Sequence, residues 1–212
     1  MPRSSSIAGR RLAARECFAN AAETIGPCEA GMSLFAITRG QWSMIDAVLH
    51  CLDCVGKAKV SLWTWTVAEY EVQVLTRLRV DERITDGRLV IDHGARHKNA
   101  AIIAEWKNTF GAGSVRYVIN HAKIATVESE SGLKFLLRGS MNLNYNPRFE
   151  QFDITEGGPE FDLVREIEDE LPDLEDDCGG AEVYAGSQID NAFRPEQLSL
   201  FGTMKTWKPR PK

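Results

Sequence analysis

The sequence predicts an α/β fold in which a mixed β-sheet is flanked by helices on both faces. Apolar, β-branched segments alternate along the chain with segments whose apolar residues recur at helical spacing. Alternation on this scale is typical of a sheet that is covered by its own connecting helices. The chain has 212 residues, which is enough for one domain with a sizeable core.

The expected elements follow one another from residue 33 onward. Strands are expected at 33–38, 59–67, 88–92, 115–127 and 133–137, and helices at 42–55, 68–80, 97–110 and 163–174. The strand segments are rich in β-branched and apolar residues, and the helical segments carry apolar residues three and four positions apart. Gly56 follows the first helix at the position where glycine commonly ends one.

Three regions are expected along the chain. Residues 1–32 are rich in Arg, Ala and Ser, and their weak helical pattern from Leu12 to Ala22 ends before Gly26-Pro27. We expect them to form an N-terminal appendage that is partly helical or disordered. One domain is expected at 33–178, and residues 179–212 are expected to form a C-terminal tail with a basic end.

The net charge of −5 is unevenly distributed. Residues 160–177 hold ten acidic residues and one Arg, which leaves a net charge of +4 on the other residues. We interpret the acidic segment as a helix with a solvated face, and mimicry of a nucleic acid is the alternative. The basic residues near both ends of the chain suit contact with phosphates, because neutralising phosphates releases counterions. The alternative is that they only keep the termini soluble.

Five cysteines, an odd number, stand at positions 17, 28, 51, 54 and 178, which indicates free thiols in a reducing compartment. Cys51 and Cys54 form a CxxC, but no second pair completes a tetrahedral zinc site, so we expect them to be core thiols. We find no apolar run long enough for a membrane span and no secretory signal. We therefore expect a cytoplasmic protein without a membrane partner.

The residues with the most chemical information lie between 121 and 150. His121 and Lys123 stand two apart in the apolar run 115–127, so in a strand both side chains would project from one face. An imidazole can attack phosphorus and hold it covalently, and an ammonium neutralises the non-bridging oxygens.

Small polar residues follow the next apolar run, 133–137. Gly139 would let the backbone approach a ligand closely, while Ser140 and Asn142 offer a hydroxyl and an amide. The two segments together are expected to form one face that binds a phosphodiester.

These residues resemble the signature of the phospholipase D superfamily, which is His-x-Lys, an Asp five residues after the Lys, and a Gly-Ser-x-Asn turn. The matching residues are His121, Lys123, Gly139, Ser140 and Asn142, with Glu150 at the place of a trailing Glu and Glu128 in place of the Asp. In element order the resemblance covers roughly residues 33–170. It implies a phospholipase D-like fold and a phosphodiesterase domain.

The resemblance also implies roles for these side chains. His121 is expected to be the nucleophile or general acid and Lys123 the phosphate clamp, while Asn142 and Ser140 orient the phosphate and the rings. Glu150 is expected to accept a hydrogen bond from Nδ1 of His121 and so fix its tautomer.

The remaining site residues have supporting roles. Glu128 keeps the charge of the Asp that it replaces and is expected to be structural. Substrate-binding residues are expected to be Gly139, Ser140, Asn144 and Arg148. The superfamily needs no metal or other cofactor for its reaction, so none is expected here.

The sequence contains one copy of each motif, and this number bears on whether the chain forms an oligomer. In-line displacement needs an attacking group on one side of phosphorus and a proton donor on the other. The superfamily supplies both with two motif copies, so a single copy implies a homodimer in which the two His121 side chains meet at a two-fold axis. We expect them within ~7 Å of each other, because a reacting atom sits about 3–3.5 Å from its target.

The function that this favours is a metal-independent endonuclease that acts through a phosphohistidine, on DNA more than on RNA. A non-catalytic nucleic-acid-binding dimer that keeps the phosphate pocket is the alternative from another class. A lipid hydrolase of the phospholipase D type is a second alternative, which fits the length and the single motif poorly.

Two further groups have less specific interpretations. Trp63 and Trp65 share one face of a strand, and core packing is preferred to base stacking. His93 and His97 follow Asp92 near the carboxyl edge of the expected sheet. Contact with the substrate backbone is preferred there to a metal site, and an exposed loop is the alternative.

Overall fold

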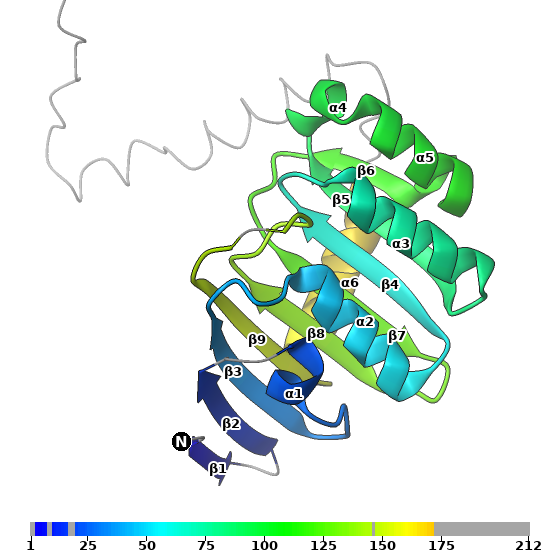
Figure 1. The fold of residues 1–212 in the computed structure, drawn as a ribbon. Helices are drawn as coiled ribbons and strands as arrows, with labels where there is room; N and C mark the ends of the chain where they lie inside the picture. Colours follow the sequence, from blue (N-terminus) through cyan, green and yellow to red (C-terminus); the bar gives the residue numbers. More distant parts are fainter. Residues whose placement is uncertain (1–2, 8–9, 17–19, 146, 172–212) are drawn as a thin grey trace, which may run out of the picture. The chain divides into compact units, whose positions relative to one another are not determined.

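The computed structural model describes residues 3–7, 10–16, 20–145 and 147–171, all within the compact unit Met1–Asp173. In this part of the chain the strands form one nine-stranded sheet with the order β1-β2-β3-β9-β8-β7-β4-β5-β6 (Figure 1). The expected tail at 179–212 lies outside the described residues.

The strands are β1 (Arg3–Ile7), β2 (Arg10–Glu16), β3 (Met32–Thr38), β4 (Ala58–Thr64), β5 (Ile84–Asp92), β6 (Val115–Val118), β7 (Ile124–Ser129), β8 (Lys134–Gly139) and β9 (Glu150–Glu156). The helices are α1 (Ala21–Ile25), α2 (Met44–Val55), α3 (Glu69–Val80), α4 (Ala95–Lys98), α5 (Ala100–Phe110), the 3-10 turn η1 (Ala112–Ser114) and α6 (Pro159–Glu170).

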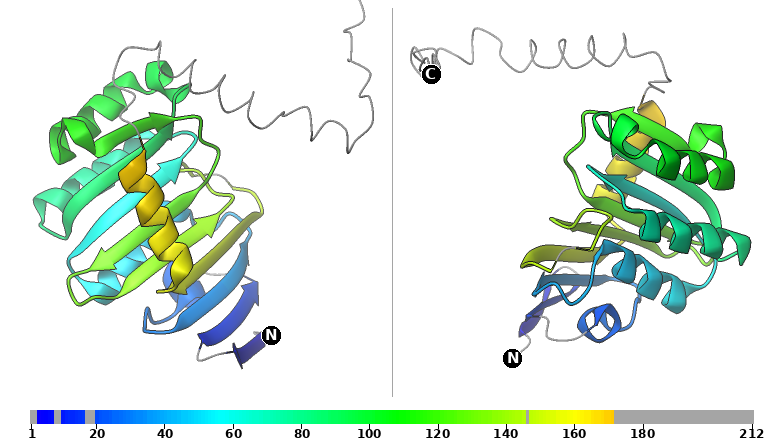
Figure 2. Two further views of the ribbon diagram at one scale, coloured as in Figure 1. Left: turned by 180° about the vertical axis from the view of Figure 1, so that it is seen from behind. Right: turned by 45° about the horizontal axis from the view of Figure 1, so that its top comes forward.

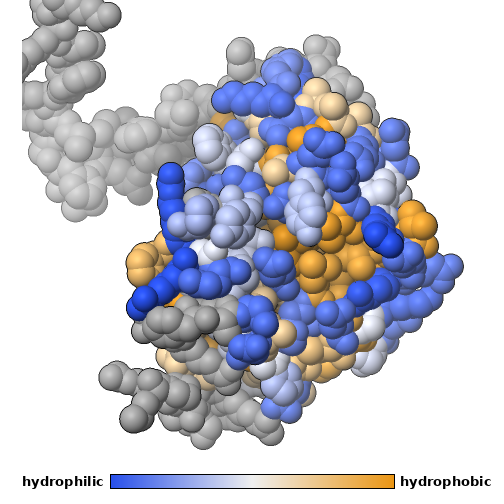
Figure 3. Space-filling model, viewed as in Figure 1, coloured by the Kyte–Doolittle hydropathy of each residue, from blue (hydrophilic) through white to orange (hydrophobic). Residues whose placement is uncertain are grey.

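Helices cover the sheet on both faces, so the predicted α/β architecture is confirmed. Helices α2, α3 and α5 lie on one face, and α6 crosses the other face (Figure 2). Under α6, Phe161 and Val164 pack with Leu136, and Trp63 and Ile124 border this cluster. On the opposite face, Figure 3 shows an apolar area between α2 and α3 surrounded by hydrophilic side chains.

The strand directions bring many connections to one edge of the sheet. β4, β5 and β6 are parallel to one another, while β7 is antiparallel to β4 and β8, and β9 is antiparallel to β8 and β3. Consequently β3, β4, β5, β6 and β8 end where β7 and β9 begin. We call this edge the site edge, and it is marked by Thr64, Asp92, Val118, Gly139, Ile124 and Glu150.

Two predictions about individual elements are wrong. The apolar run 115–127 is not one strand: β6 ends at Val118 and β7 begins at Ile124. The two strands belong to different places in the sheet, since β6 is the last strand and β7 lies between β4 and β8. The chain must therefore leave the sheet between them.

The helical pattern from Leu12 to Ala22 also fails in its first half, because residues 12–16 belong to β2, while α1 contains Ala21 and Ala22. β2 pairs with β3 along its length. Pairing with an open strand edge overrides a weak local helical pattern.

The acidic segment forms α6 as far as Glu170, and residues 172–177 lie outside the described part of the chain. Asp162, Glu166 and Asp169 are exposed, as expected for a solvated face, but Glu168 is only 3% exposed. None of the described helices combines the length and the apolar character that a membrane span requires.

Glu168 fixes α6 to the sheet. Its carboxylate accepts hydrogen bonds from the Ser61 hydroxyl, from Trp63 Nε1 at 2.6 Å and from Arg165 at 2.5 Å. The guanidinium of Arg88, on β5, lies 3.8 Å away. A buried carboxylate needs such partners, because burial of an unpaired charge is costly. The indole of Trp63 thus packs under α6, as predicted, and also donates to it.

Replacing Glu168 with Ala should lower the free energy of unfolding by about 2–4 kcal/mol, because two donors on β4 would lose their acceptor and Arg165 its partner. Urea unfolding measures the change. The matched control is Glu166→Ala, an exposed position on the same helix, which should stay within about 0.5 kcal/mol of the wild type. Equal effects of the two substitutions would show that Glu168 does not anchor the helix.

Candidate active site

The segment 119–123 runs across the site edge from β6, past the ends of β5 and β4, to the start of β7. His121 and Lys123 lie in this connection, so the expectation that they project from one strand is wrong. His121 and Lys123 lie close together because the path of this connection is fixed.

Asn120 holds this connection in place and is only 6% exposed. Its side-chain amide donates to the carbonyl of Thr64 at 3.1 Å and accepts from the backbone N–H of Ala122 at 2.9 Å. Its own backbone N–H donates to the carboxylate of Asp92 at 3.0 Å. The amide therefore ties the loop to β4, and Asp92 ties it to β5. The sequence analysis missed this role of Asn120, although an Asn directly before His-x-Lys is visible in the sequence.

His121 and Lys123 form a close pair in which the imidazole is exposed and the lysine is buried. Nζ of Lys123 lies 2.9 Å from Nδ1 and 3.3 Å from Nε2 of His121, and it donates to the His121 carbonyl at 2.6 Å. Burial lowers the pKa of Lys123 from its ordinary value, while the carboxylate of Glu150 acts in the opposite direction. The structure thus places an amine donor directly beside an exposed imidazole.

Ser140 and Glu150 meet where β8 ends and β9 begins. The Ser140 hydroxyl donates to the Glu150 carboxylate and accepts from the backbone N–H of Gln151 at 2.9 Å. The proposed hydrogen bond from Nδ1 of His121 to Glu150 stays a prediction, and in the structure Lys123 lies beside Nδ1.

Gly139 permits the close approach of these two strands. A Cβ atom at this position would lie 2.5 Å from the carbonyl oxygen of Gln151. We expected the missing side chain to admit a ligand, but what approaches Gly139 in the structure is the backbone of β9.

Asn142 joins the end of β8 to the end of β4. Its Oδ1 accepts from the backbone N–H of Trp65 at 3.3 Å and lies 3.4 Å from the hydroxyl of Thr64, which donates to the carbonyl of Thr66 at 2.6 Å. The same hydroxyl accepts from the backbone N–H of Leu143 at 3.1 Å. Asn142 thereby fixes the backbone that carries Trp65.

Trp65 is the aromatic residue that the sequence analysis placed wrongly. β4 ends at Thr64, so Trp65 lies beyond the strand, is 47% exposed and has its ring centroid 6.0 Å from that of His121. The prediction of core packing is confirmed for Trp63 and wrong for Trp65. The expected strand extends to residue 67, but β4 ends at Thr64, so the indole of Trp65 is not part of the sheet. An exposed indole therefore lies beside the exposed imidazole.

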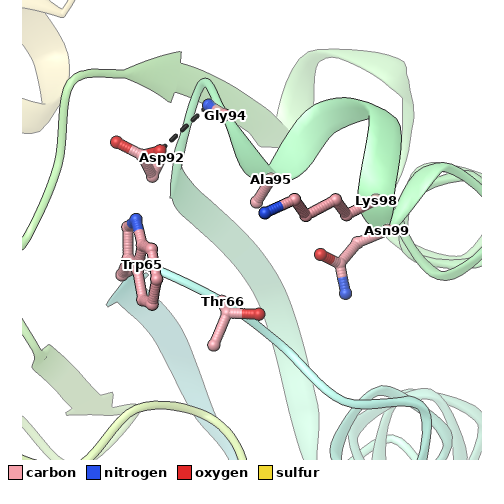
Figure 4. Close-up of a pocket in the computed structure, with 7 residues that line it drawn as sticks. All are labelled: Trp65, Thr66, Asp92, Gly94, Ala95, Lys98 and Asn99. Carbon is pink, nitrogen blue, oxygen red and sulfur yellow. Dashed lines mark hydrogen bonds between the residues drawn. The ribbon is translucent and has the colours of Figure 1, made fainter. Parts of the chain in front are cut away.

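A pocket of about 170 Å³ adjoins this indole. It is lined by Trp65, Thr66, Asp92, Gly94, Ala95, Lys98 and Asn99. Figure 4 shows the Lys98 side chain extending from α4 into the space between Ala95 and the Trp65 ring. Asp92 is already engaged, because its carboxylate also accepts from the backbone N–H of Gly94 at 2.9 Å. The pocket combines an aromatic plane with a cation.

The loop between β8 and β9 carries the other two predicted substrate-binding residues. Asn144 is half-buried and Arg148 is exposed. Tyr145 donates through its hydroxyl to the carbonyl of Gly40 at 3.0 Å. A Cβ atom at Gly40 would lie 2.7 Å from the backbone nitrogen of Arg148 and 2.5 Å from Pro147. Close contact with the loop after β3 therefore positions the backbone next to Arg148.

Glu128 lies away from the site edge. It stands near the far end of β7, opposite Lys59 on β4 and Lys134 on β8. Five residues of strand separate it from Lys123, which is about 16 Å at the usual rise per residue. The structure therefore brings together His121, Lys123, Ser140, Asn142 and Glu150, and it leaves Glu128 outside this group.

Comparison with known proteins gives structural neighbours only. No protein-family model matches the chain, and no curated protein matches it in sequence. Similar solved structures include Nuc from Salmonella typhimurium, a phospholipase D family member, at 17% identity and a TM-score of 0.40 over 58% of this chain and 83% of that one.

Two larger proteins also match. A polyphosphate kinase from Porphyromonas gingivalis has 14% identity and a TM-score of 0.45, covering 68% of this chain and 27% of that one. A mutant of yeast tyrosyl-DNA phosphodiesterase has 12% identity and a TM-score of 0.37, covering 59% and 32%. Because these values are low, we argue the function from the residues of the site.

Asn120→Ala should remove the anchor of the loop that carries His121. Several buried backbone groups would lose their partner, so the free energy of unfolding should fall by about 2–3 kcal/mol. The control is Asn108→Ala, an exposed position on α5, for which little change is expected. Urea unfolding of both variants measures the difference. An Asn120→Ala protein as stable as the control would mean that other contacts hold the loop.

Proposed function

We propose that the chain is a metal-independent phosphodiesterase of the phospholipase D type that cleaves nucleic acid as an endonuclease, DNA more than RNA. The observation that carries the proposal is the contact between the buried amine of Lys123 and the exposed imidazole of His121, 2.9 Å apart. A nucleophile and a cation at this distance can engage the phosphorus and a non-bridging oxygen of the same phosphate.

In the proposed reaction, a ring nitrogen of His121 attacks phosphorus, and the bond from phosphorus to the leaving sugar oxygen breaks. The partner's His121 donates a proton to that oxygen. Water then attacks the phosphohistidine, loses its proton to the partner's His121, and releases a 5′-phosphate and the free imidazole. Lys123 donates to a non-bridging oxygen in both steps.

The other site residues support this chemistry. Asn142 and Ser140 orient the phosphate and the rings, and Asn144 and Arg148 contact the substrate backbone. Glu150 lies close enough to Lys123 to affect its pKa. In the proposed reaction it balances the positive charge that develops on the imidazole during attack.

The reaction requires two imidazoles, and each chain supplies one at this position. We therefore propose a homodimer whose subunits meet along the site edge. Exposed apolar and aromatic side chains gather on the loops and the first turn of α3 at this edge, and they are Tyr70, Ile119, Tyr145 and Phe149. Aromatic residues of this kind are enriched in the buried parts of interfaces between proteins.

The pocket beside His121 supports nucleic acid as the substrate. Its indole offers a plane for stacking a base, and the amine of Lys98 can pair with a neighbouring phosphate. Stacking on an aromatic residue combined with cationic contacts is the usual way in which proteins bind single strands without sequence preference.

Nicking of supercoiled plasmid in the presence of EDTA tests this function. The wild type should cut, because histidine and lysine take the place of a metal ion. His121→Ala and Lys123→Ala should each lower the rate by about 10³-fold or more. Lys59→Ala is the control, since Lys59 is exposed near the opposite end of β4.

Three results would contradict the proposal. Binding of DNA without cleavage by the wild type favours the non-catalytic binding dimer. Unchanged nicking by His121→Ala would place the active residues elsewhere. Hydrolysis of phosphatidylcholine vesicles without cleavage of plasmid would favour a lipid substrate.

A further inference from the structure

Three cysteines and a histidine gather at the edge of the sheet opposite the site edge. Cys28 lies in the loop between α1 and β3, and His50, Cys51 and Cys54 lie on α2. Positions 50, 51 and 54 share one side of the helix, because residues three and four apart are neighbours on its surface. β3 begins four residues after Cys28, and β4 begins four residues after Cys54, so both segments lead into strand starts.

Three of the four ligand atoms are close enough to share one ion, and the fourth adjoins one of them. Those of Cys28, His50 and Cys54 all lie within 4.8 Å of one another, and Sγ of Cys51 lies 3.7 Å from Sγ of Cys28. Two thiolates on a tetrahedral zinc ion are about 3.8 Å apart, as follows from a Zn–S bond of about 2.3 Å. The pair of buried sulfurs thus already has the spacing of one edge of a zinc tetrahedron.

His50 contacts the thiols through Nε2, which lies 3.6 Å from Sγ of Cys54 and 2.7 Å from the carbonyl oxygen of Gly26. A carbonyl can only accept, so without metal Nε2 carries the proton and donates it to Gly26. When zinc binds Nε2, the ring proton resides on Nδ1 and the contact with Gly26 gives way to the metal bond.

We propose that Cys28, Cys51, Cys54 and His50 bind one Zn²⁺ ion that has a structural role. Three thiolates and an imidazole are a donor set that zinc prefers and that saturates its tetrahedral coordination, which leaves no position for a substrate. The ion joins the loop before β3 to α2, and thereby fixes the chain where it enters the central part of the sheet. The CxxC alone did not indicate the site, because the remaining two ligands come from the loop and from a single histidine.

A disulfide between Cys28 and Cys51 is the competing use of these thiols. Their Sγ atoms lie 3.7 Å apart, well beyond the S–S bond length of about 2.05 Å, so both cysteines are free thiols in the structure. The same distance fits two sulfurs on one zinc ion.

The test uses the full chain purified under reducing conditions without chelator. Metal analysis of the wild type should give about one zinc per chain, and after replacement by Co²⁺ the absorption spectrum should show the intense visible bands of tetrahedral cobalt bound to thiolates. Cys28→Ser and His50→Ala should each lose most of the metal. Cys178→Ser is the matched control and should keep it.

Stability provides a readout that does not depend on folding of the variants. Zinc added to metal-free wild type should raise its melting temperature, since an ion that binds only the folded chain stabilises it. Wild type without zinc and without a tetrahedral cobalt spectrum overturns the proposal, as does a Cys28–Cys51 disulfide found by mass spectrometry, or equal metal in Cys28→Ser and Cys178→Ser. None of these outcomes bears on plasmid nicking, because the group lies away from His121.

Discussion

The candidate site depends on how the chain crosses from β6 at the end of the sheet to β7 in its middle. This crossing forces residues 119–123 over the ends of two parallel strands, where backbone carbonyls would otherwise lack partners. The amide of Asn120 satisfies one of these carbonyls and holds the loop in a single path. Because the path is fixed, the buried amine of Lys123 lies against the exposed imidazole of His121.

The antiparallel directions of β7 and β9 explain why residues distant in sequence meet at the site edge. Since β7 and β9 run against their neighbours, their first residues lie where β4, β5 and β8 end. The strand ends and starts at this edge each contribute a polar or aromatic side chain, such as Trp65 after β4 and Glu150 at the start of β9. The opposite edge carries the group of Cys28 and His50, which we propose to be structural. The candidate active site and the proposed zinc site thus lie at opposite ends of the strands.

Much of the architecture could be predicted from local patterns. The strands near residues 33 and 59 and the helices after them follow their apolar periodicity closely, because these segments alternate simply along the chain. The run 115–127 could not be divided correctly, since a continuous apolar stretch does not reveal that its halves occupy separate places in a sheet. β2 was missed for a related reason, because its pairing with β3 is tertiary and its own pattern is weak.

Motif spacing identified the residues that gather at the site edge, but it could not give their contacts. Trp65 was assigned to the core because its alternation with Trp63 continues past the true end of the strand. Glu128 stands at the position of the motif's Asp, and five residues of strand separate it from Lys123. Asn120 and Gly40 act through buried backbone contacts, which only the fold reveals.

The central claim is that one reaction centre needs His121 from two chains. Heterodimers of wild type and His121→Ala, carrying different tags and purified through both, test it most directly, with doubly tagged wild type as the reference. A shared centre predicts nicking per dimer close to that of the His121→Ala homodimer, because either the attacking or the proton-donating imidazole is missing. Half of the wild-type rate would show that each chain works alone and would contradict the account.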